Sequence, residues 1–519
     1  QAADTMTARG IAVAAPNDGA AQAGVRVAAD GGNAVDAATA AALVTMTTEP
    51  GVVSLASGAY VTVLPPDGSP PVTVDGWVEM PGRGLPPERF GHGVWDITTE
   101  YGGGTTMTIG HGSVATPGSL KALDLAHRAH GLLPWARVVE PAVEAAEGFP
   151  HGDASHRYLS HVHELVFGWH PDSHAALHDA AGELIGPGDT VVVPHLAATL
   201  RQIADQGAET LYTGDLAALI ADDMAANGGI LTRADLAAYD AVVRPALEVR
   251  TGDWRFATNP APAVGGVVTA AMLRLLDGVP ARGAWSPDEV GRLVRVEAAV
   301  LGARLAELDV EDARVARAEQ LLATVAADGL RGLGSPSTAH VSAVDDHGAA
   351  CAVTMSAGYS SGAVTPGTGL WLNNALGEQE LNHAGVHSLP PGTRLTSNMA
   401  PTVGRRDSDG AVLAIGSPGS DRISTALAQV LALFVNGGLD LHSAIAYPRA
   451  HVRVRDDVLV DHEEDLELPA DLPLRSRTMP AHSMYFGGVG AAMWTPSIGL
   501  LAAGDPRRTG AVAVHTLGT

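Results

Sequence analysis

The sequence predicts an α+β protein in which two layers of sheet are covered on their outer sides by helices. Three observations predict this fold. Helical patterns recur before residue 329, and alternating strand patterns dominate after it. In addition, 46% of the 519 residues are hydrophobic, with 61 glycines and 33 prolines, which is typical of a globular chain with a large core. The length suffices for two to four domains, and no internal repeat is evident.

The part of the chain before residue 329 begins with an apolar strand at residues 11–15. A helix at 20–29 ends at Asp30-Gly31-Gly32-Asn33, because glycine stops helices, and an alanine-rich helix at 34–46 follows. Further helices are expected at 117–130, 134–148, 196–206, 215–227, 233–239, 267–276, 290–308 and 312–327, with strands at 51–63 and 241–250.

The part after residue 329 is rich in strands. Strands at 339–345 and 349–356 are joined by Asp346-His347-Gly348, a hairpin signal. Other strands are expected at 369–374, 402–405 and 411–416, before a helix at 424–435.

Charge and composition exclude several classes of function. The formal net charge of -25 would repel nucleic acids and anionic membranes, so we expect neither as a partner. Lys121 is the single lysine and Cys351 the single cysteine, which argues against Schiff-base chemistry, internal disulfides and a cysteine metal cluster. We therefore expect no cofactor and no metal. No basic-then-apolar leader follows Gln1, so a targeting segment has been removed or never existed, and the compartment stays open.

The segment from Pro336 to Asp345 holds the strongest candidate for chemistry. Thr338 stands between small residues, directly before a strand. A threonine hydroxyl is a weak nucleophile without a base, and cleavage between Ser337 and Thr338 would supply one in the freed α-amine. The alternative interpretation is a Ser/Thr-rich loop that enters an ordinary strand.

Later segments offer groups that such a nucleophile needs. Gly416-Ser417-Pro418-Gly419-Ser420 joins a strand to a helix, and its backbone N–H groups could hold an oxyanion. A simple strand-to-helix turn is the alternative. Ser397-Asn398 and Asn373-Asn374 place polar groups beside strands, although the two asparagines could be turn residues only.

Two other motifs are ambiguous. Residues 148–182 contain seven histidines, but their irregular spacing matches no metal motif, so a polar solvated segment is preferred over a metal site. Gly265-Gly266 opens a helix without a following lysine, which favours close packing over a phosphate cradle.

Several ordered motifs together resemble the γ-glutamyltransferases, members of the N-terminal nucleophile hydrolases. The resemblance covers about residues 10–455 and is strongest at Thr338-Ala339-His340-Val341-Ser342-Ala343-Val344-Asp345. The other matching motifs are Gly31-Gly32-Asn33-Ala34-Val35-Asp36-Ala37-Ala38, Asn227-Gly228-Gly229, Asp235-Leu236-Ala237-Ala238-Tyr239, Gly265-Gly266, Leu372-Asn373-Asn374, Met399-Ala400-Pro401-Thr402 and Gly416-Ser417-Pro418-Gly419.

The resemblance implies a four-layer αββα sandwich built from one precursor. The cut between Ser337 and Thr338 would give a large, helix-rich subunit, 1–337, and a small, strand-rich subunit, 338–519, which stay together as a heterodimer. Thr338 would be the nucleophile, Ser356 its hydrogen-bond partner, and Gly419 with the N–H of Ser420 the oxyanion hole.

The donor pocket departs from the family pattern. Val78 stands where the family has an arginine that clamps the α-carboxylate, and losing a bidentate partner removes a large orienting contribution. Gly358 replaces an asparagine that meets the donor's amino group, and the Asn-Asn-Gln pattern becomes Asn373-Asn374-Ala375. The remaining positions of the implied pocket are Glu378, the acidic partner of the ammonium, Ser397-Asn398 in place of a serine pair, and Ser420 in place of a glycine. Arg83 or Arg422 could supply a substitute cation.

The sequence thus predicts a self-processing threonine hydrolase or acyltransferase that cleaves an amide of a small acyl substrate, with water or an amine as acceptor. A different acyl donor from a standard γ-glutamyl peptide is expected. Two alternatives stay open: a natural-product enzyme that cleaves a carbon–carbon bond next to a carbonyl, and an unprocessed, non-catalytic binding scaffold.

Overall fold

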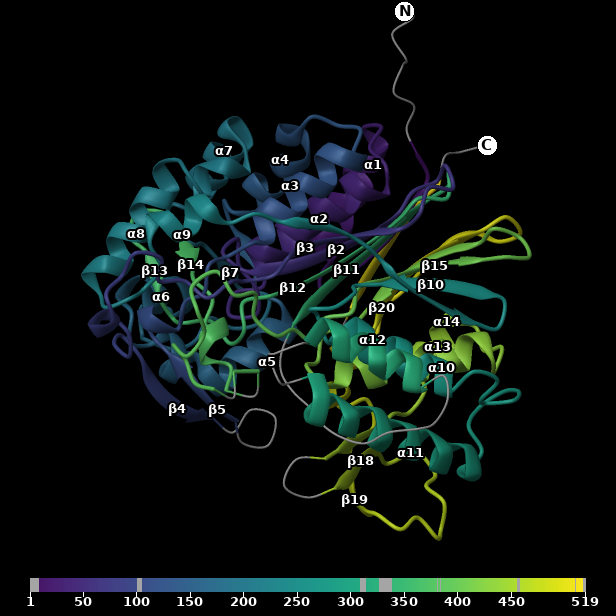
Figure 1. Cartoon of the computed structure of the whole chain (residues 1–519). Helices are drawn as coiled ribbons and strands as arrows, with labels where there is room; N and C mark the ends of the chain where they lie inside the picture. The colour runs from purple at the N-terminus through teal and green to yellow at the C-terminus, as the bar shows by residue number, and fades with distance from the viewer. Residues whose placement is uncertain are drawn as a thin grey trace, which may run out of the picture.

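Two antiparallel sheets packed face to face form the centre of the computed structural model, and helices cover both outer faces (Figure 1). The structure describes residues 9–99, 105–308, 314–325, 338–379, 381–382, 384–454, 458–508 and 510–516. The expected α+β class and the four-layer αββα arrangement are confirmed. Within the described residues, no helix is both long and apolar enough to cross a membrane.

The first sheet has seven strands in the order β22-β1-β11-β12-β2-β3-β8. Their bounds are β22 (Ala511–His515), β1 (Ile11–Ala15), β11 (Ala339–Asp345), β12 (Ala350–Ser356), β2 (Gly58–Leu64), β3 (Val72–Gly76) and β8 (Val242–Pro245). β11 lies between β1 and β12, with Ile11 opposite Asp345 and Ala339 opposite Met355. The strand that follows Thr338 is therefore bonded on both edges.

The second sheet has six strands in the order β21-β20-β16-β15-β10-β9. Their bounds are β21 (Gly499–Ala503), β20 (Gly490–Thr495), β16 (Val412–Gly416), β15 (Thr402–Arg406), β10 (Trp254–Thr258) and β9 (Leu247–Thr251). Both sheets thus combine strands from before and after Thr338.

Smaller sheets and hairpins lie outside this sandwich. They are formed by β4 (Trp95–Thr99) with β5 (Thr105–Ile109), β6 (Phe149–Pro150) with β7 (Thr190–Val191), β13 (Val364–Thr365) with β14 (Leu370–Trp371), and β17 (Ala450–Arg453), β18 (Leu459–Glu463) and β19 (Arg475–Met479).

Helices α1 (Asp18–Ala29), α2 (Ala34–Thr48) and α3 (Ser119–His130) cover the seven-stranded sheet, and α10 (Gly265–Leu275) and α13 (Arg422–Val435) cover the six-stranded sheet. The other helices are α4 (Trp135–Ala145), α5 (Asp153–Val162), α6 (Pro171–Leu177), α7 (Leu196–Gln206), α8 (Asp215–Ala226), α9 (Arg233–Ala238), α11 (Pro287–Ala303), α12 (Arg314–Val325) and α14 (Leu441–Ala446).

Local chemistry explains where the first helices start. The Asn17 side chain accepts a hydrogen bond from the N–H of Ala20 at the start of α1. Asn33 and Asp36 form a capping box at the start of α2, which satisfies N–H groups that a helix leaves unpaired. All residues of α2 are buried, as its small side chains predicted.

Small apolar side chains fill the space between the two sheets. This inner layer includes Ala12, Val344, Ala352, Val412, Ala414 and Ala492, all 0% exposed. Short side chains allow the sheets to pack closely at native density. The start of β11 is therefore held in a rigid part of the molecule.

One strand prediction was wrong. The segment 241–250, expected as a single strand, divides at Pro245 and Ala246 into β8 and β9, which belong to different sheets. Proline has no N–H to donate to a ladder, so the strand changes partners there. The sequence analysis also did not predict β3, β4, β5, β6, β7, β10, β13 or the strands from residue 450 onward.

Candidate active site

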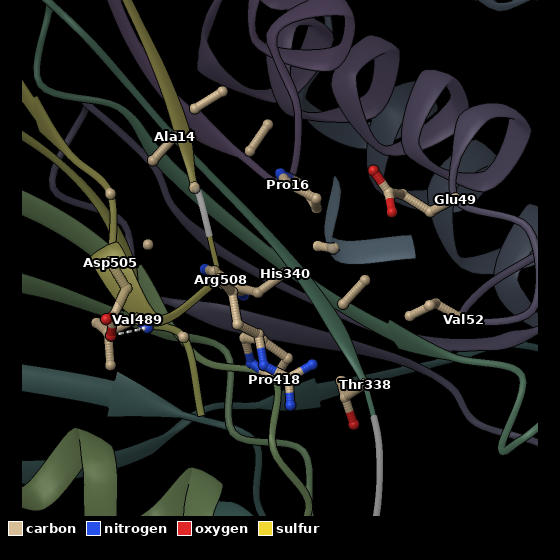
Figure 2. Close-up of a pocket in the computed structure, with 18 of the residues that line it drawn as sticks. Ala14, Pro16, Glu49, Val52, Thr338, His340, Pro418, Val489, Asp505 and Arg508 are labelled. Carbon is tan, nitrogen blue, oxygen red and sulfur yellow. Dashed lines mark hydrogen bonds between the residues drawn. The ribbon is translucent and has the colours of Figure 1, made fainter. Parts of the chain in front are cut away.

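Thr338 precedes β11 directly and is 3% exposed. It lines a cavity of about 60 Å³ together with His340 and Pro418 (Figure 2). The walls of this cavity are largely apolar and include Ala14, Val52 and Val489. Ser337, the residue on the other side of the expected cleavage point, lies outside the described residues.

Ser356 is the last residue of β12, the strand that pairs with β11. Ala339 pairs with Met355, and Thr338 and Ser356 each come one step beyond this pair. The Ser356 Oγ accepts a hydrogen bond of 3.0 Å from the N–H of Gly358. This places the residue expected to contact the nucleophile on the neighbouring strand.

The expected oxyanion turn joins β16 to α13. Gly419 has φ of +120° and Ser420 has φ of +74°, a region that favours glycine. A Cβ at Gly419 would come within 2.6 Å of the Gly487 Cα, so the turn also needs a glycine sterically. Among the described residues, the N–H of Gly419 donates to no other group. Successive backbone N–H groups of a turn near a helix start can form an anion-binding nest.

Asp421 fixes the end of this turn through His451 and Arg422. Its carboxylate accepts hydrogen bonds from His451 Nε2 at 3.0 Å and from Arg422 Nη1 at 2.7 Å. Burial alone would raise the pKa of Asp421, but His451 and Arg422 outweigh it and hold the pKa well below its usual value. Arg422, expected as a substitute cation for substrate, is thus ion-paired within the turn.

His340 is a neutral side chain whose tautomer follows from its hydrogen bonds. Ser342 Oγ donates to the Gly490 carbonyl at 3.2 Å, so His340 Nε2 must donate to Ser342 Oγ at 2.8 Å. The Nδ1 atom then accepts from Thr354 Oγ1 at 2.8 Å. Burial lowers the pKa of His340 to about 3, which keeps the ring uncharged. His340 is therefore a rigid support and no proton acceptor near neutral pH.

Gly358, Asn374 and Glu378 form a second cluster, joined to Ser356 by the hydrogen bond from Gly358. A Cβ at Gly358 would lie 2.4 Å from Asn374 Oδ1 and 3.1 Å from Glu378 Cδ. Asn374 Oδ1 accepts from the N–H of Tyr359 at 2.6 Å, and its Nδ2 donates to the Thr108 carbonyl at 3.1 Å. The Asn374 amide is therefore occupied in holding backbone, and no side chain longer than glycine fits at 358 without displacing it.

Asn373 and Ala375 have structural roles. Asn373 Nδ2 donates to the carbonyls of Ala56 and Ala115, and its Oδ1 accepts from the N–H groups of Ala115 and Ala375. Its hydrogen-bonding capacity is thus used within the protein. Ala375 is buried at 1% exposure.

Ser397 and Asn398 pack against the start of α10. The Ser397 carbonyl accepts from the N–H groups of Val264 and Gly265 at 2.9 and 3.1 Å. A Cβ at Gly265 would come within 1.9 Å of the Asn398 carbonyl oxygen. The interpretation of Gly265-Gly266 as a close-packing site is confirmed, because the space in front of Gly265 is filled by protein.

Val78 is buried in the apolar core and presents no polar group. The nearby arginines serve other partners. Arg394 donates to the Trp77 carbonyl and the Tyr239 hydroxyl, and Arg83 lies 3.4 Å from Asp235 and 3.5 Å from Glu79. Neither of these arginines lines the cavity that contains Thr338.

The histidine-rich segment holds no metal-type cluster among the described residues. His163 Nδ1 and His178 Nε2 lie 2.8 Å apart, and His174 stacks on His178 with ring centroids 4.0 Å apart. This contact requires one imidazole nitrogen to donate and the other to accept, so the two rings hydrogen-bond each other.

The sequence analysis did not predict three charged residues in the cavity wall, Glu49, Asp505 and Arg508. Glu49 directly precedes Pro50, Asp505 directly precedes Pro506, and Arg508 follows Pro506 by two residues. Charged residues in these proline-containing turns were the signal in the sequence that could have indicated them as site residues. Their side chains reach Thr338's cavity only through the packing of α2 and the C-terminal segment around β11.

Fold and site together define an amide-cleaving hydrolase of the N-terminal nucleophile type. The chain belongs to the family described as gamma-glutamyltranspeptidase, whose model matches residues 20–515.

Two curated relatives illustrate the family. The Acylase ACY 1 proenzyme of Pseudomonas sp. strain V22 is 30% identical over 83% of this chain and 80% of its own length. The Glutathione hydrolase proenzyme of Escherichia coli strain K12 is 29% identical over 85% of this chain and 80% of its own length. Among solved structures, the cephalosporin acylase from Bacillus halodurans shares the fold with a TM-score of 0.80 at 23% identity, covering 98% of this chain and 96% of that chain.

Proposed function

We propose that the chain cleaves its own peptide bond between Ser337 and Thr338 and then uses Thr338 as the nucleophile that cleaves an amide. The position of Thr338 carries the proposal. It lies directly before a strand bonded on both edges and one step beyond the Ala339–Met355 pair, and it lines the same cavity as Pro418 of the oxyanion turn. An acylase and a glutathione hydrolase that are both named proenzymes support the same chemistry.

The reaction needs only groups of this chain and water. The α-amine of Thr338 accepts the hydroxyl proton while Oγ attacks the acyl carbonyl. The Gly419 N–H, with that of Ser420, stabilises the negative charge on the carbonyl oxygen. Collapse breaks the C–N bond, and the leaving nitrogen takes the proton from the α-ammonium. Water, or an amine in transfer, then attacks the ester carbonyl and gives a proton to the α-amine. As the ester bond breaks, the resulting α-ammonium gives this proton to the Thr338 oxygen.

We infer that the acyl donor differs from a γ-glutamyl peptide. Val78 is apolar and fully buried, so it cannot pair with an α-carboxylate. Gly358 brings no side chain, and the space where one would stand is taken by Asn374. Arg83, Arg394 and Arg422 each pair with carboxylates of the protein, so none replaces the missing clamp.

A denaturing gel tests the processing. The wild-type protein should give fragments of 337 and 182 residues, Thr338→Ala should stay whole, and Thr338→Ser should still split because serine keeps the hydroxyl. A single band in a folded, active wild-type sample would refute the proposal, and a folded but inactive single band would favour the binding scaffold.

A substrate panel tests the chemistry. Wild-type protein should release nitroaniline from 4-nitroanilides of simple acyl chains faster than from γ-glutamyl 4-nitroanilide. Efficient turnover of the glutamyl compound would contradict the altered pocket. Turnover of a ketone substrate without any released amine would point instead to carbon–carbon cleavage.

A further inference from the structure

Glu49 is a buried carboxyl group that the proposed reaction does not use. It follows the last residue of α2, is 3% exposed and lines the cavity that contains Thr338. Its Oε1 accepts a 2.6 Å hydrogen bond from Asn17 Nδ2, whereas Oε2 accepts none from any described residue. Figure 2 shows the carboxyl group extending from α2 toward Pro16, into the space that the cavity residues enclose.

A second cavity, of about 280 Å³, meets the first at Glu49. The two share the wall residues Pro16, Glu49, Ala154, Gly510 and Ala511. The outer cavity also reaches Asp18 and Asp153, which are exposed. Glu49 therefore stands between an acidic opening at the surface and the cavity of the nucleophile.

The charges of the outer cavity favour a cation. Asp18 and Asp153 face Glu49 from the outer cavity, and Asp505 and Arg508 line the inner one. Asp505 is already paired with Arg449 at 2.6 Å and with Arg507 at 3.1 Å. Burial raises the pKa of Glu49 to about 7, and the hydrogen bond from Asn17 offsets this rise only in part. A bound ammonium would compensate the charge of the ionised carboxylate further and would donate to Oε2.

We propose that Glu49 binds the amine partner of the acyl-transfer reaction in its ammonium form, and that the two adjoining cavities are the path of this amine to and from Thr338. The inference rests on the proposed function, since an amide-cleaving enzyme must release an amine and a transferase must admit one. After the C–N bond breaks, the neutral amine takes a further proton from water and becomes the cation that Glu49 attracts. The largely apolar wall of the inner cavity suits a short alkyl chain on that amine.

Ligand-observed NMR tests this inference without any turnover. The probes are n-butylammonium and the neutral 1-butanol, titrated into the mature wild-type protein and into Glu49→Gln at about pH 8, where a carboxyl with a pKa of about 7 is mostly ionised. We expect butylammonium to bind the wild type about tenfold or more tightly than it binds Glu49→Gln, a loss typical of a charged contact. The exposed Glu88→Gln should bind like the wild type.

Two outcomes would overturn the inference. One is equal binding of butylammonium to the wild type and to Glu49→Gln, and the other is equal binding of butylammonium and butanol to the wild type. The second comparison needs no variant, so it decides the matter even if Glu49→Gln fails to fold. Failure of the proposed function itself would show separately, as a wild-type protein that does not split at Thr338.

Discussion

The imidazole ring of His340 lies so close to Gly416 that a Cβ on this glycine would come within 2.2 Å of the ring carbon Cε1. His340 belongs to β11, the strand that begins after Thr338, and Gly416 ends β16 and opens the turn to Gly419. The contact therefore sets the spacing between the proposed nucleophile and the proposed oxyanion hole.

Gly416→Ala should disturb this spacing. Overpacking typically costs about 1–3 kcal/mol, and a displacement near 1 Å at an active site costs about 100-fold in rate. We expect a lower melting temperature and a fall of about 100-fold in kcat/KM for any turned-over anilide. Gly490→Ala is the matched control, because its Cβ would meet Ala14 Cβ at 3.6 Å and His340 Cδ2 at 3.8 Å, which are ordinary contacts. Equal activity of the two variants would contradict the positioning role.

The pH dependence of stability should report the buried His340. Its pKa is lowered to about 3 in the folded protein, whereas an unfolded histidine titrates at about 6.5. Between these values the unfolded state binds more protons, so this group's contribution to the free energy of unfolding grows with pH and is lost as the pH falls below about 6.5. We expect the drop in melting temperature from about pH 7 to about pH 4.5 to be smaller in His340→Gln than in the wild type. The exposed His442→Gln should keep the wild-type drop; an unchanged drop in His340→Gln would disprove this assignment.

Gly358→Ala should be more damaging than Gly367→Ala, although both glycines have φ above zero, +65° and +74°. The left-handed conformation costs an L-residue about 1–2 kcal/mol at either position. Only at 358 does the new Cβ also meet a side chain, Asn374 Oδ1 at 2.4 Å, while nothing lies within 4 Å at 367. Thermal unfolding should separate the variants, and equal losses would show that Asn374 moves aside freely. If Asn374 does not move aside, Gly358→Asn will not restore recognition of a γ-glutamyl donor.

Asp505 should be essential for the stability of the C-terminal segment. Its carboxylate accepts hydrogen bonds from Arg449, Arg507 and the N–H of Val489 in a fully buried network. Removing Asp505 leaves the buried Arg449 without its carboxylate partner, a loss that typically costs about 3–5 kcal/mol, whereas Arg507 keeps its ion pair with Glu463. Asp505→Ala should therefore lower the denaturation midpoint strongly. Asp409→Ala removes a surface ion pair with Arg406 and should cost less than about 1 kcal/mol. A mild effect of Asp505→Ala in this comparison would mean that water enters and solvates Arg449.

Local pattern was a good guide to single elements. The strand at 339–345, the helix at 196–206 and the turn at 416–420 lie where residue type and spacing predicted them. Hydrophobic alternation and glycine signals act within a few residues, so they can be read along the chain. The partners of an element cannot be predicted in this way. β22, near the end of the chain, pairs with β1, near its start. β8 ends at Pro245 in the first sheet, and the next strand, β9, belongs to the second sheet.

The candidate site likewise contains residues that the sequence predicted and residues that it did not. Thr338 and Gly419 were predicted from motifs and Ser356 from the family resemblance, and their roles stay predictions; Thr338 directly precedes β11, and Gly419 has φ of +120°. Asn373 was expected as a site or turn residue, but its amide is fully used by backbone groups from distant segments. Glu49 and Arg508 were not predicted, because they meet Thr338's cavity from opposite ends of the chain.

The sequence by itself determined the kind of fold, the order of most elements and the threonine on which the chemistry is proposed to depend. These features follow from residue type, periodicity and short motifs. Only the tertiary structure decided which polar groups are occupied by the protein and which face open space. The physical reason is that burial and pairing depend on neighbours hundreds of residues away, such as Asn17 with Glu49 on one side of the cavity and Arg508 on the other.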